Sequence, residues 1–342
     1  MSRVKFGHYV PQLHLRYFAH AGEKRLHCFD KTEGKVLIAP VNRVAAERNF
    51  YDLVGQAEQF AERTFNDLEG ATGTIYKRIA TAPREDITEN DLKQLAPFVA
   101  TQLLRTRVVR DNIVNVRNES RQAAEEGRPL PKSARRNVLR NLNEVVSVQR
   151  SQIEAMTDPK RRDEALKVLE AVAEEAYEDV RKGRFPRVLA NGQPDSVKDD
   201  QVKRSHLQAL ANSVTLQTEA LLSSSWTLIK PPRDERLWTT DNPVVRLNST
   251  KRIDSDAGFS MVMPLTPTRG IGIMNIATLP SSPVVELTSD EVFALRRLQI
   301  LQSTRFVMAS DGDFAAAREL LSKEPQLSKP FTEPFGGLSN LR

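Results

Sequence analysis

The sequence predicts an α+β protein that is mainly helical, with a mixed or antiparallel sheet built from both terminal regions and a large central helical region. Two observations support this class. Short runs rich in β-branched and aromatic residues, separated by Gly, Pro, Asn and Asp, occur near both ends of the 342-residue chain. Between them, apolar residues recur at helical spacing. We therefore expect strands from both ends to share one sheet, with helices packed against it.

This pattern predicts a single domain over residues 1–342. Residues 1–54 and 226–310 form its β-rich core, and residues 55–225 form a helical region packed on the core. A chain of this length exceeds the usual size of one hydrophobic core, so two intimate halves are the alternative organisation.

The first elements are a short helix and a hairpin. Pro11 suits the first position of a helix over "PQLHLRYFA", where its missing amide is harmless. The runs "RLHCFDK" and "KVLIAPV" are predicted strands joined by the turn-forming "TEG". Cys28, the only cysteine, lies in the first of them and excludes an internal disulfide or a cysteine-cluster metal site.

Helical spacing begins near Gln56 and ends before Pro83. Thr88 and Asp91 form a capping-box pattern at the start of the next helix, and Pro97 predicts a break or kink within it. Interruptions at "EGRPLPKS" and "MTDPKRR" divide the central helices. After the β-leaning runs "WTLIK", "RLWTT", "VVRLN", "GFSMVMPL" and "GIGIMNI", two final helices are expected.

Composition excludes several classes of protein. Charged residues make up 27% and hydrophobic residues 39% of the chain, which argues against wholesale disorder. No apolar run approaches the length of about 20 residues that a transmembrane helix needs, and the start lacks the apolar core of a signal peptide. We expect a cytoplasmic protein with no membrane partner.

The net charge of +6 is unevenly distributed. Residues 128–140 contain five cations and no acid, and we expect them on the surface of the helical region, as candidates for contact with nucleic acid: Arg128, Lys132, Arg135, Arg136 and Arg140. The alternative is an ordinary solvated helix face, since glutamates flank the stretch on both sides.

Two segments near opposite ends of the chain offer chemistry. His8 precedes the first helix in an extended segment, where its side chain can point into a cleft or bond to the backbone at the helix entry. Asp241 and Asn242 follow a predicted strand, and strand ends hold catalytic carboxylates rigidly. Asp–Asn–Pro is also a routine turn sequence.

Two helices add charged candidates. Glu58, Glu62 and Glu69 lie close to one helical stripe, which is normally solvated although one member can turn inward. Gln102, Arg105 and Arg107 occur among apolar residues. An inward arginine serves as a structural ion pair or as an anion clamp.

The motifs "HYVPQLHLRYF", "CFDK", "ERNFYDL", "FNDLEG", "ATQLLRTR" and "TTDNPVV…MPLTP" occur in the order typical of an uncharacterised bacterial family, domain of unknown function 4238. The chain resembles a full-length member over roughly residues 8–310. The resemblance implies a shared fold and raises the expectation that one constellation combines His8, Glu69, Gln102, Arg107, and Asp241 with Asn242. Glu69 is preferred to its helical neighbours because "FNDLEG" matches the family pattern.

Two functions compete. The first is a nuclease-like hydrolase acting on a phosphate-containing substrate, nucleic acid or a nucleotide. His8, Glu69 and Asp241 are its catalytic candidates and also the candidate ligands of a divalent metal ion, and Gln102, Arg105, Arg107 and Asn242 are its substrate-binding candidates. The second is a non-catalytic nucleic-acid-binding or protein-interaction protein in which the same polar groups form an internal scaffold. The sequence has no "HExxH" motif and no phosphate-binding glycine loop.

Overall fold

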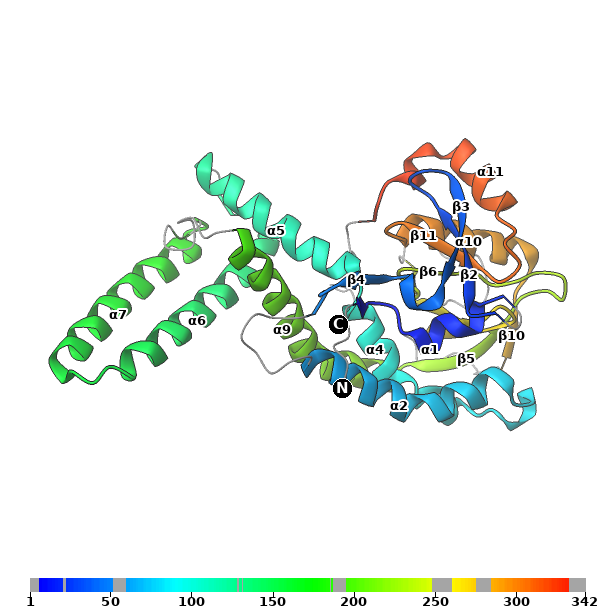
Figure 1. The fold of residues 1–342 in the computed structure, drawn as a ribbon, viewed down its shortest axis with the longest axis horizontal. Coiled ribbons are helices and arrows are strands. Elements are labelled where there is room, and N and C mark those ends of the chain that lie inside the picture. The colour runs from blue at the N-terminus through cyan, green and yellow to red at the C-terminus, as the bar shows by residue number, and fades with distance from the viewer. Residues whose placement is uncertain are drawn as a thin grey trace. The chain divides into compact units, whose positions relative to one another are not determined.

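The computed structural model describes residues 6–20, 23–51, 60–127, 129–130, 132–184, 186, 195–247, 260–274 and 284–331 (Figure 1). The chain divides into two compact units. Unit 1 comprises Met1–Arg110 and His206–Arg342, and unit 2 comprises Asp111–Ser205. The boundaries fall inside helices α5 (Arg107–Glu125) and α9 (Asp195–Leu222).

The described part of unit 1 contains three sheets. A two-stranded sheet pairs β1 (Phe6–His8) with β4 (Ala46–Arg48). A four-stranded sheet has the order β3-β2-β11-β6, with β2 (Arg25–Asp30), β3 (Lys35–Pro40), β6 (Thr239–Thr240) and β11 (Phe306–Ala309). A five-stranded sheet has the order β10-β5-β9-β8-β7, with β5 (Ser225–Lys230), β7 (Val245–Arg246), β8 (Met261–Thr266), β9 (Arg269–Met274) and β10 (Val284–Glu286).

The four-stranded sheet joins the two ends of the chain. Strand β11 pairs antiparallel with β2 on one side and with β6 on the other, so Val307 lies opposite both Phe29 and Thr240. Strands β2 and β3 form the expected hairpin, and Gly34 takes a positive φ of 68° in its turn. Among the described strands, β5 and β10 are the one pair that runs parallel, which makes the five-stranded sheet mixed. The predicted α+β class, with a sheet built from both terminal regions, is confirmed.

Two helix starts in unit 1 fall at residues that the sequence marks, whereas the helix expected over Pro11–Ala19 is a single turn, Gln12–Leu15, followed by a 3-10 turn. Thr88 and Asp91 form the predicted capping box, and Pro97 lies in the first turn of a new helix. The helices are α1 (Gln12–Leu15), α2 (Phe60–Thr81), α3 (Glu89–Lys93), α4 (Ala96–Leu104), α10 (Ser289–Gln302) and α11 (Ala315–Lys323). Short 3-10 turns are η1 (Arg16–Phe18), η2 (Val41–Arg43), η3 (Arg84–Asp86) and η4 (Pro325–Ser328).

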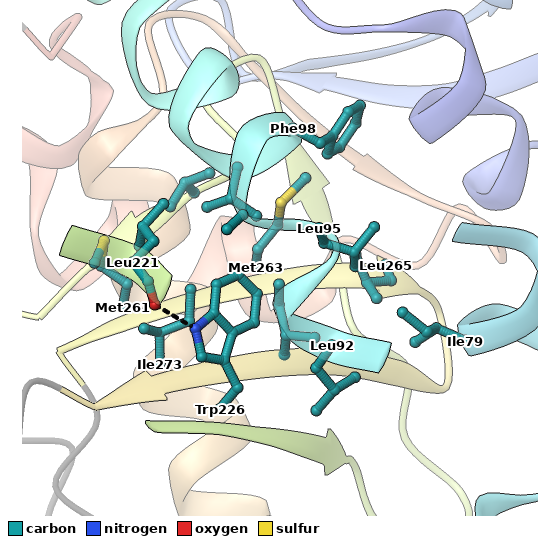
Figure 2. Close-up of a cluster of buried hydrophobic side chains, with 14 of the residues drawn as sticks. Ile79, Leu92, Leu95, Phe98, Leu221, Trp226, Met261, Met263, Leu265 and Ile273 are labelled. Carbon is teal, nitrogen blue, oxygen red and sulfur yellow. Dashed lines mark hydrogen bonds between the residues drawn. The ribbon is translucent and has the colours of Figure 1, made fainter. Parts of the chain in front are cut away.

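The largest apolar cluster of unit 1 surrounds Trp226 (Figure 2). Leu92 and Leu95 cover its indole from one side, and Met263 and Ile273 of the five-stranded sheet lie on the other. The indole Nε1 donates a hydrogen bond of 2.7 Å to the carbonyl oxygen of Leu221, so the buried ring leaves no polar group unpaired. Helices α2 to α4 thus pack on the sheet and belong to unit 1. The expected helical region of residues 55–225 is therefore shared between the two units.

Unit 2 is built around the hairpin of α6 (Lys132–Glu154) and α7 (Pro159–Arg181), which run side by side in Figure 1. Asp158 caps α7 by accepting hydrogen bonds from the backbone N–H groups of Lys160 and Arg161. The helices bury a small cluster of Leu130, Val138 and Val180.

Candidate functional site

Arg105, at the end of α4, is the centre of the polar cluster in unit 1. Its side chain is only 2% exposed. Nη1 donates a hydrogen bond of 3.0 Å to Oε1 of Glu69, and Nη2 donates to the carbonyl oxygen of His8. The guanidinium lies over the ring of Phe65, 4.3 Å from its centroid. Arg105 therefore has the surroundings of an internal ion pair, and both of its terminal nitrogens are already hydrogen-bonded.

The same cluster fixes the N-terminal segment. Gln102 donates a hydrogen bond of 2.9 Å from Nε2 to the carbonyl oxygen of Tyr9, one residue beyond the His8 carbonyl that Arg105 binds. Tyr51 donates a hydrogen bond of 2.8 Å from its hydroxyl to the carbonyl oxygen of Arg105. The side chains of Gln102 and Arg105 therefore satisfy carbonyl groups at the end of β1, and Tyr51 satisfies a carbonyl group at the C-terminus of α4.

His8 is half-buried at the end of β1. Its Nε2 is buried and has no hydrogen-bond partner among the described residues. Burial and, secondarily, the charge of Arg105 lower the pKa of His8 to about 4, so its imidazole is neutral at pH 7. Arg107 lies at the edge of this cluster, 44% exposed, and pairs with Glu47 at 2.8 Å.

Asp241 occupies a different place from the one that the sequence suggested. It is fully buried, and its carboxylate accepts hydrogen bonds from the backbone N–H groups of Thr304 (2.8 Å), Arg305 (2.7 Å) and Phe306 (2.9 Å). Burial raises the pKa of Asp241, and the three hydrogen bonds act against that rise. The carboxylate thus closes the turn that leads into β11. The Asp–Asn–Pro sequence therefore has the structural role of a turn, which was the alternative to a catalytic role.

Lys31 is the cation whose charge acts on the Asp241 carboxylate, and sequence analysis missed it. It is 1% exposed, and its Nζ donates a hydrogen bond of 2.7 Å to the carbonyl oxygen of Ile300. Burial lowers the pKa of Lys31 to about 8, and the charge of Asp241 opposes this shift. No periodic pattern reveals such a lysine, because it directly follows strand β2 and is enclosed only when α10 packs beside it.

Asn242 lines a small cleft beside the α4–α5 junction. Its Nδ2 donates a hydrogen bond of 3.0 Å to the carbonyl oxygen of Gln302. Thr106 and Arg246 line the same cleft, which has room for little more than a water molecule. Burial lowers the pKa of Arg246 to about 10. The cleft places Asn242 beside the α4–α5 junction, next to Arg105 in sequence.

The structure therefore brings together only some of the predicted residues. His8, Glu69, Gln102 and Arg105 form one cluster, with Arg107 at its edge, whereas Asp241 contacts β11 and its turn. Within the part of the chain that the structure describes, no hydrogen bond or ion pair joins His8 to Asp241. Nor do any three His, Cys, Asp or Glu residues of that part form a group able to hold a metal ion. Of the predicted metal ligands, His8 and Glu69 thus share Arg105 as a partner, whereas Asp241 is bonded to the backbone of residues 304–306.

The glutamate stripe of α2 differs from its usual solvated form. Glu62 is 8% exposed and Glu69 is 19% exposed in its side chain, so both turn inward. A Cβ added at Gly7 would lie 2.7 Å from Oε1 of Glu62, which explains the glycine beside His8. Glu58 lies outside the described residues.

Other buried polar residues escaped sequence analysis. His14 bonds through Nδ1 to the hydroxyl of Tyr76 (2.8 Å) and through Nε2 to the hydroxyl of Thr239 (2.7 Å). Tyr76 in turn donates to the carbonyl oxygen of Leu265, so it accepts from His14. His206 bonds to the carbonyl oxygen of Leu104 at 2.8 Å. The helical spacing of apolar residues around His14 was the available signal, because it places this histidine on the buried face.

The basic stretch falls mostly outside what the structure describes. Arg128 and the side chains of Lys132, Arg136 and Arg140 belong to the omitted residues, although the backbone of the last three lies in α6. Arg135 is half-buried, and its Nη2 would lie 2.6 Å from a Cβ added at Gly183. In the described residues, no helix is both long and apolar enough to cross a membrane.

Fold and site define an α+β protein whose polar cluster ties its N-terminal strand to a helix. The chain belongs to the family described as "Protein of unknown function (DUF4238)", whose model matches residues 7–313. This confirms the family that the sequence motifs indicated. Comparison with curated proteins and with solved structures gave no match.

Proposed function

We propose that the protein is a non-catalytic binding protein for an anionic polymer, nucleic acid being the first candidate, and that unit 2 supplies the binding surface. The observation that carries this proposal is a backbone hydrogen bond of 2.5 Å from the N–H of Leu130 to the carbonyl oxygen of Gly183. It brings the beginning of the α6 segment and the end of α7 together.

Two basic segments that are far apart in sequence meet at this bond. Residues 128–140 and residues 181–187 contain no acidic residue. Together they contribute nine cations: Arg128, Lys132, Arg135, Arg136, Arg140, Arg181, Lys182, Arg184 and Arg187. Glu178 pairs with Arg181 and Lys182 on the surface, where such pairs are weak, and the half-buried Asp179 pairs with Arg184. Such a concentration of cations favours binding to phosphates.

The buried charged residues of unit 1 also support this proposal. Arg105 and Asp241, which the hydrolase hypothesis needs for substrate and catalysis, are buried and engaged by internal partners. Groups in these surroundings stabilise a fold, and their removal leaves partners unpaired. Their positions therefore favour a scaffold over a reaction centre.

Binding is tested by fluorescence anisotropy with labelled duplex DNA and single-stranded RNA over a salt series. We expect affinity at low salt, with log K falling by about 0.9 per phosphate contacted on duplex DNA as log salt rises. The triple variant Lys132→Gln, Arg136→Gln and Arg140→Gln should bind more weakly and with a smaller salt slope. The control removes three cations of unit 1, at Lys35, Lys77 and Lys323. Equal loss in both variants, or no binding at low salt, would contradict the proposal.

The hydrolase remains a second candidate because of His8. The His8 imidazole is neutral at pH 7 and its Nε2 lacks a hydrogen-bond partner among the described residues, so this nitrogen can accept a proton from a substrate or water, although a pKa of about 4 makes it a weak base. Arg107 is the accessible neighbour that could neutralise a phosphate. The test is hydrolysis of single- and double-stranded nucleic acid by the intact protein and by His8→Gln, each with and without Mg²⁺. Activity that disappears in His8→Gln at an unchanged melting temperature would establish this candidate over the first.

A further inference from the structure

The antiparallel ribbon of β1 and β4 has two chemically different faces. Phe6 lies opposite Arg48, and His8 lies opposite Ala46. Residues that lie opposite each other across an antiparallel pair project from the same face, as do residues two apart along one strand. These four residues therefore share one side of the ribbon, which we call the arginine face.

The other face holds the acid of the ribbon. Glu47 lies opposite Gly7, and its carboxylate pairs with Arg107 at 2.8 Å. A Cβ added at Gly7 would meet Oε1 of Glu62, so this face is turned toward α2. The charge of Glu47 is thus directed away from the arginine face and is engaged on the opposite side of the ribbon.

Arg43 and Arg48 come together at Phe6. The guanidinium of Arg43, from η2, lies over the Phe6 ring, 4.3 Å from its centroid. Arg48 lies directly across the ribbon from Phe6, where the Cβ atoms of opposite residues are about 4.5–5.5 Å apart. Both arginines are exposed, and within the part of the chain that the structure describes neither forms an ion pair. Two like charges beside one ring, without an acid between them, favour the binding of an anion.

Stacking on Phe6 leaves Arg43 able to donate hydrogen bonds. A guanidinium stacks through its flat face, whereas its five N–H groups point outward in its own plane. A phosphate oxygen at that edge can accept from Arg43 while a second oxygen of the same group accepts from Arg48. Arginine forks suit this geometry, since they match phosphate with two parallel bonds.

Two further residues keep this side of the ribbon free of negative charge. Burial first, then the charge of Arg105 and to a smaller extent that of Arg16, lowers the pKa of His8 to about 4, so its imidazole is neutral at pH 7. Arg16 is exposed, and its hydrogen bond of 3.3 Å goes to the uncharged amide of Gln12. It therefore adds a third cation near His8.

The backbone holds β4 in place from both ends. Ala45 and Asn49, which flank the strand, take positive φ angles of 48° and 54°. The carbonyl oxygen of Ala45 accepts hydrogen bonds from the N–H groups of Tyr9 (3.0 Å) and Val10 (3.4 Å). A left-handed alanine persists only where the surrounding contacts fix it. The position of Arg48 is thus set before a ligand arrives, which lowers the entropic cost of binding.

We propose that the arginine face is a binding site for a phosphate group held between Arg43 and Arg48. The site requires neither the basic surface of unit 2 nor hydrolysis at His8, so it goes beyond the proposed function and stands or falls separately. The phosphate belongs either to a small phosphorylated molecule or to the backbone of a nucleic acid. Both sources offer the same chemistry, and the experiment separates them.

The first arm is isothermal titration calorimetry of the full chain with inorganic pyrophosphate at constant ionic strength. Arg48→Gln should raise the dissociation constant by about 10-fold or more, because it removes one of the two charged forks. Arg43→Lys is the second variant. It keeps a cation over Phe6 but loses the fork, and it should also weaken binding. The control is Arg318→Gln, at an exposed arginine of α11, which should bind pyrophosphate as the wild type does.

The second arm measures binding of a short single-stranded oligonucleotide by fluorescence anisotropy. A loss in Arg48→Gln that is seen with pyrophosphate identifies a small phosphorylated ligand, and a loss seen only with the oligonucleotide identifies a nucleic-acid phosphate. Either result supports the site. A wild type that binds neither probe, or equal losses in Arg48→Gln and Arg318→Gln, would overturn it. The triple variant of unit 2 should bind pyrophosphate normally, and loss of that binding would overturn the assignment to unit 1.

Discussion

The two units use the same kinds of charged residue for opposite purposes. In unit 1, Arg105 and Asp241 are buried and bind groups that are distant in sequence. Arg105 binds the carbonyl oxygen of His8, and Asp241 binds the backbone N–H of Phe306. In unit 2, most charged side chains of α7 lie on the outside of the helix. The buried residues of α7 are Ala173, Ala176 and Val180. The difference shows that the role of a charged residue depends on whether its side chain is buried or exposed. Burial makes it a connector of chain segments, whereas exposure leaves it available to a partner.

Removing the carboxylate of Asp241 is expected to have the largest effect. Asp241→Ala leaves the backbone N–H groups of Thr304, Arg305 and Phe306 without their acceptor and leaves the charge of Lys31 uncompensated. We expect the free energy of unfolding to fall by about 3–5 kcal/mol. Urea unfolding followed by circular dichroism measures it.

The matched acid in unit 2 is Glu170. It pairs with Arg150 at 3.1 Å, and both side chains are largely exposed. Glu170→Gln should change the free energy of unfolding by no more than about 0.5 kcal/mol. Similar losses in the two variants would remove the contrast between a buried and an exposed acid on which the comparison rests.

Two arginines at the α4–α5 junction extend the comparison within unit 1. Arg105→Met breaks the bonds to Glu69 and to the His8 carbonyl, and we expect a loss of about 2–4 kcal/mol. Arg107→Met breaks the half-exposed pair with Glu47, and because its side chain is 44% exposed we expect a cost of less than about 1 kcal/mol. Thermal unfolding of both variants is the measurement. A larger loss at Arg107 would mean that the exposed arginine, and not the buried one, ties the segments together.

Stability should also fall as the pH decreases from 6.5 to 5. Burial lowers the pKa of His14 to about 3 and that of His206 to about 4, from an unfolded value of 6.5. In this range the unfolded chain takes up protons that the folded chain excludes, so each histidine destabilises the fold by up to about 2 kcal/mol at pH 5. The raised pKa of Asp241 acts in the opposite direction.

The contribution of one histidine can be isolated. His206→Gln keeps a donor for the carbonyl oxygen of Leu104 but cannot be protonated. Its unfolding free energy should depend less on pH between 6.5 and 5 than that of the wild type, by about one proton. Equal slopes for the two proteins would show that His206 is not held neutral in the folded state.

Local features could be read from the sequence because they depend on neighbouring residues. The capping box of Thr88 and Asp91, the new helix at Pro97 and the hairpin turn at Gly34 are examples. The sheet shared by both ends was also predictable, since β-leaning runs concentrate there. The division into two units was harder to foresee, because α2 to α4 have the same helical pattern as α6 and α7 and differ in what covers them.

The candidate site shows the same limit at the level of single side chains. The sequence predicted one constellation of His8, Glu69, Gln102, Arg107, Asp241 and Asn242. The structure places the first three around Arg105, with Arg107 at the edge of the cluster. Only the tertiary structure decided that Asp241 faces the backbone of residues 304–306, that Glu62 turns inward and that Lys31 is enclosed. The reason is physical. The state of a charged group depends on its desolvation and on its partners, and both are supplied by segments that a linear pattern cannot bring together.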